Sequence, residues 1–153
     1  MFLRRRNLLA AVVSASGLAL LTTTSALAQP TERLPIDRPT DVRGVRAACT
    51  GIGDREEREI RWNAYPLKLE VVGGYGQYLG DQNVTLVNHD GADVLHVSCD
   101  APWLMMRLQP GRYTAVVRVR HATTKDVNFI VPREGQRDLI VRFPSLMTGQ
   151  EIG

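Results

Sequence analysis

Two cysteines, Cys49 and Cys99, are the residues of this sequence with the most specific chemistry. An even number of cysteines in an exported chain favours a disulfide. Closing a loop of about 50 residues would stabilise the fold by about 4 kcal/mol in the chain-entropy model. The alternative is two separate buried thiols. There is no Cys-x-x-Cys motif, so a thioredoxin-like redox role is not expected.

Histidine and methionine side chains could bind copper or zinc in an exported protein. The candidates are His89, His96, His121, Met105 and Met106. Their spacing does not form a ligand set, because His89 and His121 fall in predicted turns and His96 falls within a predicted strand. Adjacent methionines on a strand point to opposite faces. We therefore expect no metal and no cofactor, and a periplasmic metal-binding protein remains an alternative.

A second alternative is a small hydrolase, which needs a nucleophile, a base and an orienting group. His96, Ser98 and Asp100 lie close together in the sequence, and His96 and Ser98 share a strand face. No Gly-x-Ser-x-Gly elbow is present. Asp100 precedes Ala-Pro and is better interpreted as a turn residue. We therefore expect no catalytic residue and no enzymatic activity.

Tyr75 and Tyr78 lie in the glycine-rich stretch "GGYGQY" (73–78) between two predicted strands. Loops of this kind often carry the binding residues of a β-sandwich. Trp103 follows Pro102 and precedes Leu-Met-Met, which is more typical of a buried residue. The two tyrosines therefore form the candidate binding loop.

The compartment follows from the first 28 residues. Arg4, Arg5 and Arg6 precede a long uncharged run that ends in Ala26-Leu27-Ala28. This is the pattern of a secretory signal peptide cleaved after Ala28, so we expect a periplasmic or secreted bacterial protein with no membrane span after cleavage. The run also loosely fits the twin-arginine pattern, but Sec export is preferred because no cofactor is expected.

Removal of this signal changes the charge of the chain. The full sequence has 19 Lys+Arg and 16 Asp+Glu, and the signal holds three of the arginines and none of the acids. Sixteen basic and 16 acidic residues remain, so the mature chain is neutral. Nucleic-acid binding needs a basic surface and is not expected.

The rest of the chain is predicted to fold as one domain. Residues 29–45 are proline-rich and charged without periodicity, which predicts a disordered lead-in. The folded domain should span residues 46–144, and residues 145–153 should form a tail. A short helix is expected from Asp54, with Glu57 at the capping-box spacing, and it should stop before Pro66.

Short stretches of alternating apolar and polar residues predict seven strands with turns between them. This pattern is typical of an all-β antiparallel sandwich of the immunoglobulin-like kind, or of a small barrel. The predicted strands are residues 67–72, 83–88, 93–99, 103–108, 112–120, 126–131 and 138–143.

One hairpin also carries a family resemblance. "LQPGRYTAVV" (108–117) resembles the corresponding hairpin of carboxypeptidase regulatory-like domains, which have a transthyretin-like (prealbumin-like) β-sandwich. The ordered set "DREERE", "YPLKLEVV", "GQYLGDQNVTL", "DGADVL", "APWLMMRLQPGRYT" and "VP-x-x-GQ" is similar to small secreted bacterial proteins made of that domain alone. The resemblance covers about residues 50–144 and implies a prealbumin-like sandwich without catalytic residues.

The chain departs from the wider family at "RHATTKD" (120–126), where many such domains have a glycine–aromatic pair. A partner contact at that loop need not transfer to this protein. We expect a non-enzymatic periplasmic β-sandwich that serves as a binding or accessory module in the cell envelope. Its partner would be an envelope protein or a glycan.

Overall fold

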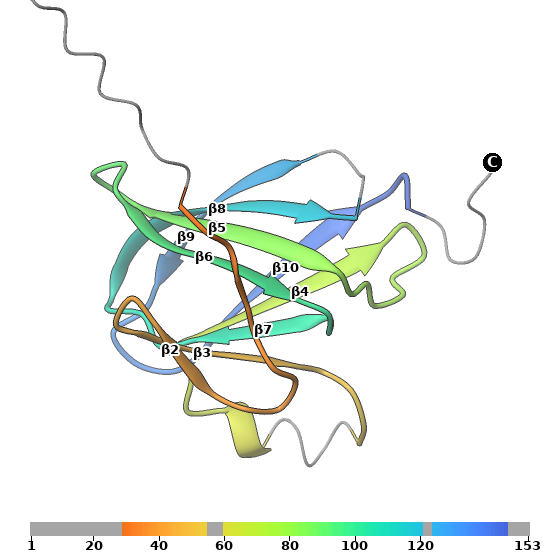
Figure 1. Ribbon diagram of the computed structural model, residues 1–153, viewed down its shortest axis with the longest axis horizontal. Coiled ribbons are helices and arrows are strands. Elements are labelled where there is room, and N and C mark those ends of the chain that lie inside the picture. The colour runs from red at the N-terminus through yellow and green to blue at the C-terminus, as the bar shows by residue number, and fades with distance from the viewer. Residues whose placement is uncertain (1–28, 55–59, 121–123, 147–153) are drawn as a thin grey trace, which may run out of the picture.

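The computed structural model describes residues 29–54, 60–120 and 124–146, and the regular secondary structure of these residues is almost entirely β (Figure 1). Ten strands form two five-stranded sheets in the described part of the chain. Sheet A has the order β1-β6-β5-β8-β9 and sheet B has the order β10-β4-β7-β3-β2. The strands are β1 (Glu32–Arg33), β2 (Thr40–Val42), β3 (Val45–Thr50), β4 (Leu67–Gly73), β5 (Gln82–Asn88), β6 (Asp93–Cys99), β7 (Trp103–Met106), β8 (Gly111–Val119), β9 (Lys125–Val131) and β10 (Arg137–Phe143).

All seven predicted strands are present, as β4 to β10. The prediction of only seven strands, all antiparallel, is wrong. Three more strands precede them, and two pairings are parallel, β1 with β6 and β10 with β4. The predicted hairpin at residues 108–117 is also wrong, because β7 pairs with β3 and β4 in sheet B whereas β8 pairs with β5 and β9 in sheet A. A parallel partner needs a long connection, so turn signals between neighbouring strands cannot reveal it.

The predicted disordered lead-in, residues 29–45, instead contributes β1 and β2. Two apolar side chains hold this segment in place, because Leu34 and Val42 are both only 3% exposed and belong to the core. Backbone hydrogen bonds add to this anchoring. The Leu34 N–H donates to the carbonyl of Ser98 at 3.0 Å, and the Asp37 N–H donates to that of Cys49 at 2.8 Å.

The predicted helix is only partly covered by the described residues. Residues 60–62 are helical and a turn follows before Pro66, whereas Glu57 of the expected capping box lies outside the described residues.

The two ends of the chain are also outside the described residues. These are residues 1–28, with the predicted signal peptide, and the end of the predicted tail from residue 147. Leu146, which belongs to the predicted tail, is partly buried and packs against the core. None of the helices found in the described ranges has the length and apolar character needed to cross a membrane.

The main core lies between the two sheets. It combines Val84, Leu86 and Val117 of sheet A with Leu69 and Leu104 of sheet B, among other residues. A second cluster lies on the other side of sheet B, because neighbouring residues on a strand point to opposite faces. This outer cluster consists of Ala48, Trp62, Tyr65, Trp103 and Met105.

The predicted disulfide is confirmed. Cys49 of β3 and Cys99 of β6 are bonded, with their Cα atoms 5.4 Å apart. Both cysteines are buried. Because β3 belongs to sheet B and β6 to sheet A, the bond joins the two sheets across the core.

Candidate functional site

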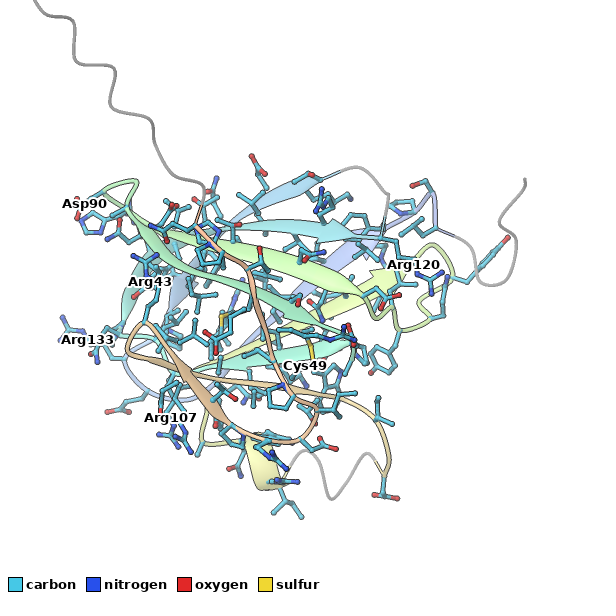
Figure 2. All side chains as sticks on the ribbon, viewed as in Figure 1. Arg43, Cys49, Asp90, Arg107, Arg120 and Arg133 are labelled. Atoms are coloured by element: carbon cyan, nitrogen blue, oxygen red, sulfur yellow. A yellow bond between two sulfur atoms is a disulfide. The ribbon has the colours of Figure 1, made fainter. Side chains whose placement is uncertain are left out.

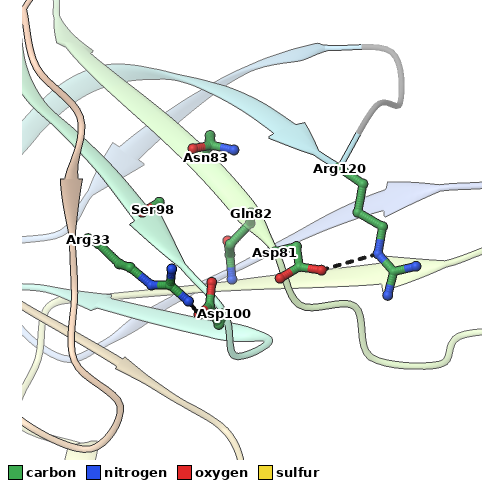
Figure 3. Close-up of a pocket in the computed structure, with 7 residues that line it drawn as sticks. All are labelled: Arg33, Asp81, Gln82, Asn83, Ser98, Asp100 and Arg120. Carbon is green, nitrogen blue, oxygen red and sulfur yellow. Dashed lines mark hydrogen bonds and ion pairs between the residues drawn. The ribbon is translucent and has the colours of Figure 1, made fainter.

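A polar hollow of about 460 Å³ lies at one end of sheet A (Figure 3). Its residues come from four separate parts of the chain: β1, the start of β5, the end of β6 with the turn after it, and the residue that follows β8. The lining residues are Arg33, Asp81, Gln82, Asn83, Ser98, Asp100 and Arg120.

Two pairs of opposite charges flank this hollow. The Arg33 guanidinium donates a hydrogen bond to the Asp100 carboxylate, and Arg120 Nε lies 3.4 Å from Asp81 Oδ2 (Figure 3). The side chains of Arg33 and Arg120 are 75% and 62% exposed. Exposed pairs of this kind contribute only about 0–1 kcal/mol. Each guanidinium can therefore exchange its carboxylate for an acidic group of a ligand at little cost.

Between the charge pairs, a row of polar side chains crosses four strands. The sheet register places Ser98 opposite both Arg33 and Asn83, and it places Asn83 opposite Arg118. Residues opposite one another in a sheet have side chains on the same face. The hollow therefore offers hydroxyl, amide and guanidinium groups in one row.

Backbone geometry positions Asp81 and Arg120. Both have a positive φ, 52° and 51°, which is uncommon for residues other than glycine. They lie just beyond the pair Gln82–Val119 at the end of the β5–β8 ladder, and the Arg120 N–H donates to the Asp81 carbonyl at 3.1 Å. Left-handed residues of this kind persist where the surrounding structure holds them, often at functional sites.

The floor of the hollow is tightly held. Gln82 is fully buried and its Nε2 donates to the carbonyl of Ala101 at 2.7 Å, whereas its Oε1 is buried without a hydrogen-bond partner in the described residues. A side chain at Gly80 would overlap the carbonyl oxygen of Asp100, so only glycine allows this close approach. The disulfide at Cys99 adds a covalent restraint beside Asp100.

The predicted tyrosine loop leads into this site but does not line it. Tyr75 is 78% exposed, and its N–H donates to Gln77 Oε1 at 3.0 Å. Tyr78 is 45% exposed and packs edge-on against Trp103, with ring centroids 6.2 Å apart. Trp103 is buried as expected, although it belongs to the outer cluster of sheet B rather than to the main core.

The candidate metal ligands lie in different surroundings. His89 Nε2 lies 3.0 Å from the carboxylate of Asp90, and His121 is outside the described residues. Met105 belongs to the outer cluster and Met106 to the main core, so the two side chains point to opposite faces as predicted. Within the described ranges, no group of three or more His, Cys, Asp or Glu side chains is arranged to hold a metal.

The candidate hydrolase residues are divided between two places. Ser98 and Asp100 line the hollow. The His96 ring is instead directed at other residues, with Nδ1 2.9 Å from Thr85 Oγ1 and Nε2 3.2 Å from Asp93 Oδ2. The contacts of these described residues therefore do not form a Ser98–His96–Asp100 arrangement.

Sequence reasoning missed Arg33, Asp81 and Arg120. Each is an ordinary charged residue with no motif around it, and only the sheet topology brings the three together. Comparisons of the chain with protein-family models, with curated proteins and with solved structures returned no match.

Proposed function

We propose that the protein is an exported, non-enzymatic binding module of the bacterial cell envelope, and that it contacts a partner protein through the polar hollow of sheet A. The observation that carries this proposal is the pair of exposed, oppositely charged contacts, Arg33–Asp100 and Arg120–Asp81, on either side of one polar row. Charges of both signs at a surface favour specificity and fast association with a complementary partner.

The rigid floor supports a binding role as well. Interactions that are held in place before a partner arrives cost less ordering entropy on association. Gln82, Gly80 and the disulfide hold the two segments that carry Asp81, before β5, and Asp100, after β6. The connecting loops at this end, including the tyrosine loop, are the usual location of binding residues on a β scaffold.

Two further observations support the envelope location and the prealbumin-like fold. A disulfide is typical of proteins that fold in an oxidising compartment such as the periplasm. Two sheets packed around one core are consistent with the carboxypeptidase regulatory-like resemblance of the sequence, although its Pro-Gly-x-Tyr segment connects β7 of sheet B to β8 of sheet A and does not form a hairpin.

Site-specific photocrosslinking in living cells tests the proposal. A photoreactive amino acid at Asn83 places the probe in the hollow, and the same amino acid at Arg133 serves as the control. Figure 2 shows Arg133 and Arg120 at opposite ends of the molecule. We expect a defined envelope protein to be captured from Asn83 and not from Arg133, and we expect the adduct to disappear in an Arg33→Ala/Arg120→Ala background.

Capture from both probe positions, or an adduct that persists without the two arginines, would contradict the proposal. The compartment is checked separately, by cell fractionation and N-terminal sequencing of the mature protein. Cleavage after Ala28 would leave Gln29 as the first residue.

A further inference from the structure

Strand β10 lies at an open edge of sheet B and carries a self-complementary set of side chains. Its core-facing residues are Leu139, Val141 and Phe143. Its other face carries Asp138, Ile140 and Arg142, all exposed, with Ile140 at 56%. When two copies of the strand run antiparallel, the acidic, apolar and basic residues of one copy face the basic, apolar and acidic residues of the other.

The backbone of the same three residues faces the open edge. The Arg137 N–H donates to the Pro66 carbonyl at 2.8 Å, on the side of β10 that pairs with β4. Successive residues of a strand direct their N–H and C=O groups to alternate sides. The backbone groups of Asp138, Ile140 and Arg142 therefore point away from β4. In agreement, the Arg142 carbonyl accepts a hydrogen bond from Lys125 Nζ on that side.

We infer that two copies of this chain pair through β10, antiparallel, about a two-fold axis that passes beside Ile140. In this register Ile140 lies opposite Ile140 of the second copy, and Asp138 lies opposite Arg142 of the second copy. Symmetry supplies each charge pair twice, as expected of an interface made by the same patch on both subunits. Opposite charges and apolar pairs directly across two strands are both favourable.

Other registers are less favourable. If the two-fold axis moves by one residue, to Leu139, Asp138 lies opposite Ile140 of the second copy. If it moves to Asp138, the two copies of Asp138 lie opposite one another. A shift the other way brings Pro144 into the ladder, where it has no N–H to donate. Only the register centred on Ile140 uses every outward backbone group and matches both charges.

The other edges of the two sheets do not offer this match. Strands β1 and β2 have two and three residues. Strand β9 has the same length as β10, and its exposed residues are Asp126, Asn128 and Ile130. Self-pairing centred on Asn128 would place Asp126 opposite Ile130 and leave its charge unmatched.

In the monomer, the charged side chains of Asp138 and Arg142 both contact β4, and they exchange these exposed contacts for the opposite charges of the second copy on pairing. Asp138 Oδ1 lies 3.7 Å from Lys68 Nζ, and Arg142 Nη1 donates to the Gly73 carbonyl at 3.4 Å. The Arg142 carbonyl can keep its bond to Lys125 and accept a second N–H, because a carbonyl oxygen has two lone pairs. An edge contact of one strand buries little surface, so we expect a reversible dimer that depends on concentration.

Sedimentation equilibrium of the mature protein, with and without charge changes on β10, tests this inference. Arg142→Asp and Asp138→Arg each place like charges opposite one another at both symmetric positions. We expect each to raise the dimer dissociation constant by about tenfold or more, and we expect the double swap Asp138→Arg/Arg142→Asp to restore it. Arg133→Asp, which changes the net charge of the chain equally but lies off this edge, should leave the dissociation constant unchanged.

Amide hydrogen exchange of the unmodified protein gives an independent measurement that needs no variant. Exchange of the Ile140 N–H should slow as the protein concentration rises. A protein that stays monomeric up to about 1 mM, or a double swap that fails to restore the dimer, would overturn the inference. The Arg33→Ala/Arg120→Ala variant should still dimerise, so the outcome is independent of the proposed function.

Discussion

The two sheets differ in what covers their outer faces. In sheet A, β8 alternates between buried residues such as Val117 and exposed ones such as Arg118, so its outer face is open to solvent. In sheet B, all seven residues of β4 and all four of β7 are buried. The outer cluster around Trp62 and Trp103 covers the central strands of sheet B, whereas the edge strands β10 and β2 carry exposed residues. An alternating sequence thus shows which residues face the core, but it does not show whether the other face is exposed.

Lys68 and Glu70 of β4 illustrate this difference. Their alternation with Leu67 and Leu69 would suit a solvent-facing pair, yet their side chains are only 10% and 12% exposed. Lys68 Nζ lies 2.7 Å from Glu70 Oε1 and 4.4 Å from the centre of the Trp103 ring. The two charges are tolerated under the outer cluster because each has partners there.

The largest expected effect comes from breaking this covered pair. Glu70→Ala should lower the free energy of unfolding by about 3–5 kcal/mol, because it leaves the buried ammonium of Lys68 without its nearest carboxylate. Urea denaturation measures the loss. The control is Asp41→Ala in the exposed pair Asp41–Arg46, where N and O are also 2.7 Å apart and about 0–1 kcal/mol is expected. Equal losses would show that the Lys68–Glu70 pair is as open to solvent as the exposed Asp41–Arg46 pair at the β2–β3 edge of the same sheet.

The next effect concerns the covalent connection between the two sheets. The Cys49→Ser/Cys99→Ser variant should lose about 2–4 kcal/mol of unfolding free energy and keep its β-rich circular dichroism spectrum, because the core between the sheets remains. Denaturant midpoints measure the loss. Thiol counting on the unreduced, denatured protein is the direct check, and two free thiols per chain would disprove the bond.

A smaller effect separates the two faces of sheet A. Val117 is fully buried, so Val117→Ala should cost about 1–3 kcal/mol of unfolding free energy. Arg118 is exposed, and Arg118→Ala should change the unfolding free energy by less than about 0.5 kcal/mol. If the arginine variant were the less stable of the two in urea, the register of β8 would have to shift by one residue.

The smallest effect lies at the partly open end of sheet A, where Tyr113 stacks on Phe129 with ring centroids 5.9 Å apart. Burial raises the pKa of Tyr113 above its usual 10.0. The folded state therefore favours the neutral phenol, and this contribution to stability is present below about pH 10 and lost as the pH rises through the raised pKa.

Tyr113→Phe should remove this part of the alkaline loss of stability. At neutral pH it should cost about 0.5–1 kcal/mol, because the Tyr113 hydroxyl donates to the Gln109 carbonyl at 2.9 Å. Denaturant midpoints measured from about pH 8 to about pH 11 check both effects. The exposed Tyr75→Phe provides the matched loss of one hydroxyl, and identical pH profiles for the two variants would contradict the assignment.

Several parts of the fold could be predicted from local patterns. The strands from β4 onward alternate clearly, and the Asp-Gly and Pro-Gly turns separate them. Strand β3, "VRAACT", was missed because its small residues give little alternation. Strands β1 and β2 were missed because Leu34 and Val42 are single apolar anchors in a polar segment. The parallel pairing of β10 with β4 depends on contacts far apart in sequence, which no local pattern encodes.

The candidate site was harder to predict than the fold. The tyrosine loop was identified from its glycines and aromatic residues, and Tyr75 is indeed exposed. The charged residues of the hollow could not be found in this way. Asp81 and Arg120 become neighbours only through the β5–β8 ladder and their left-handed backbone, and Arg33 reaches the site through a two-residue strand.

The pairing of β10 with β4 also constrains how the chain folds. Arg137 pairs with Leu67, 70 positions earlier, so β4 keeps an open edge until almost the whole described chain has emerged. Contacts between such distant residues close large loops and slow folding. Until they form, the exposed edge can pair with other chains. A chain that ended after β9 would keep the β4 edge open permanently, whereas β10 moves the open edge of sheet B to a strand that carries the charged residues Asp138 and Arg142.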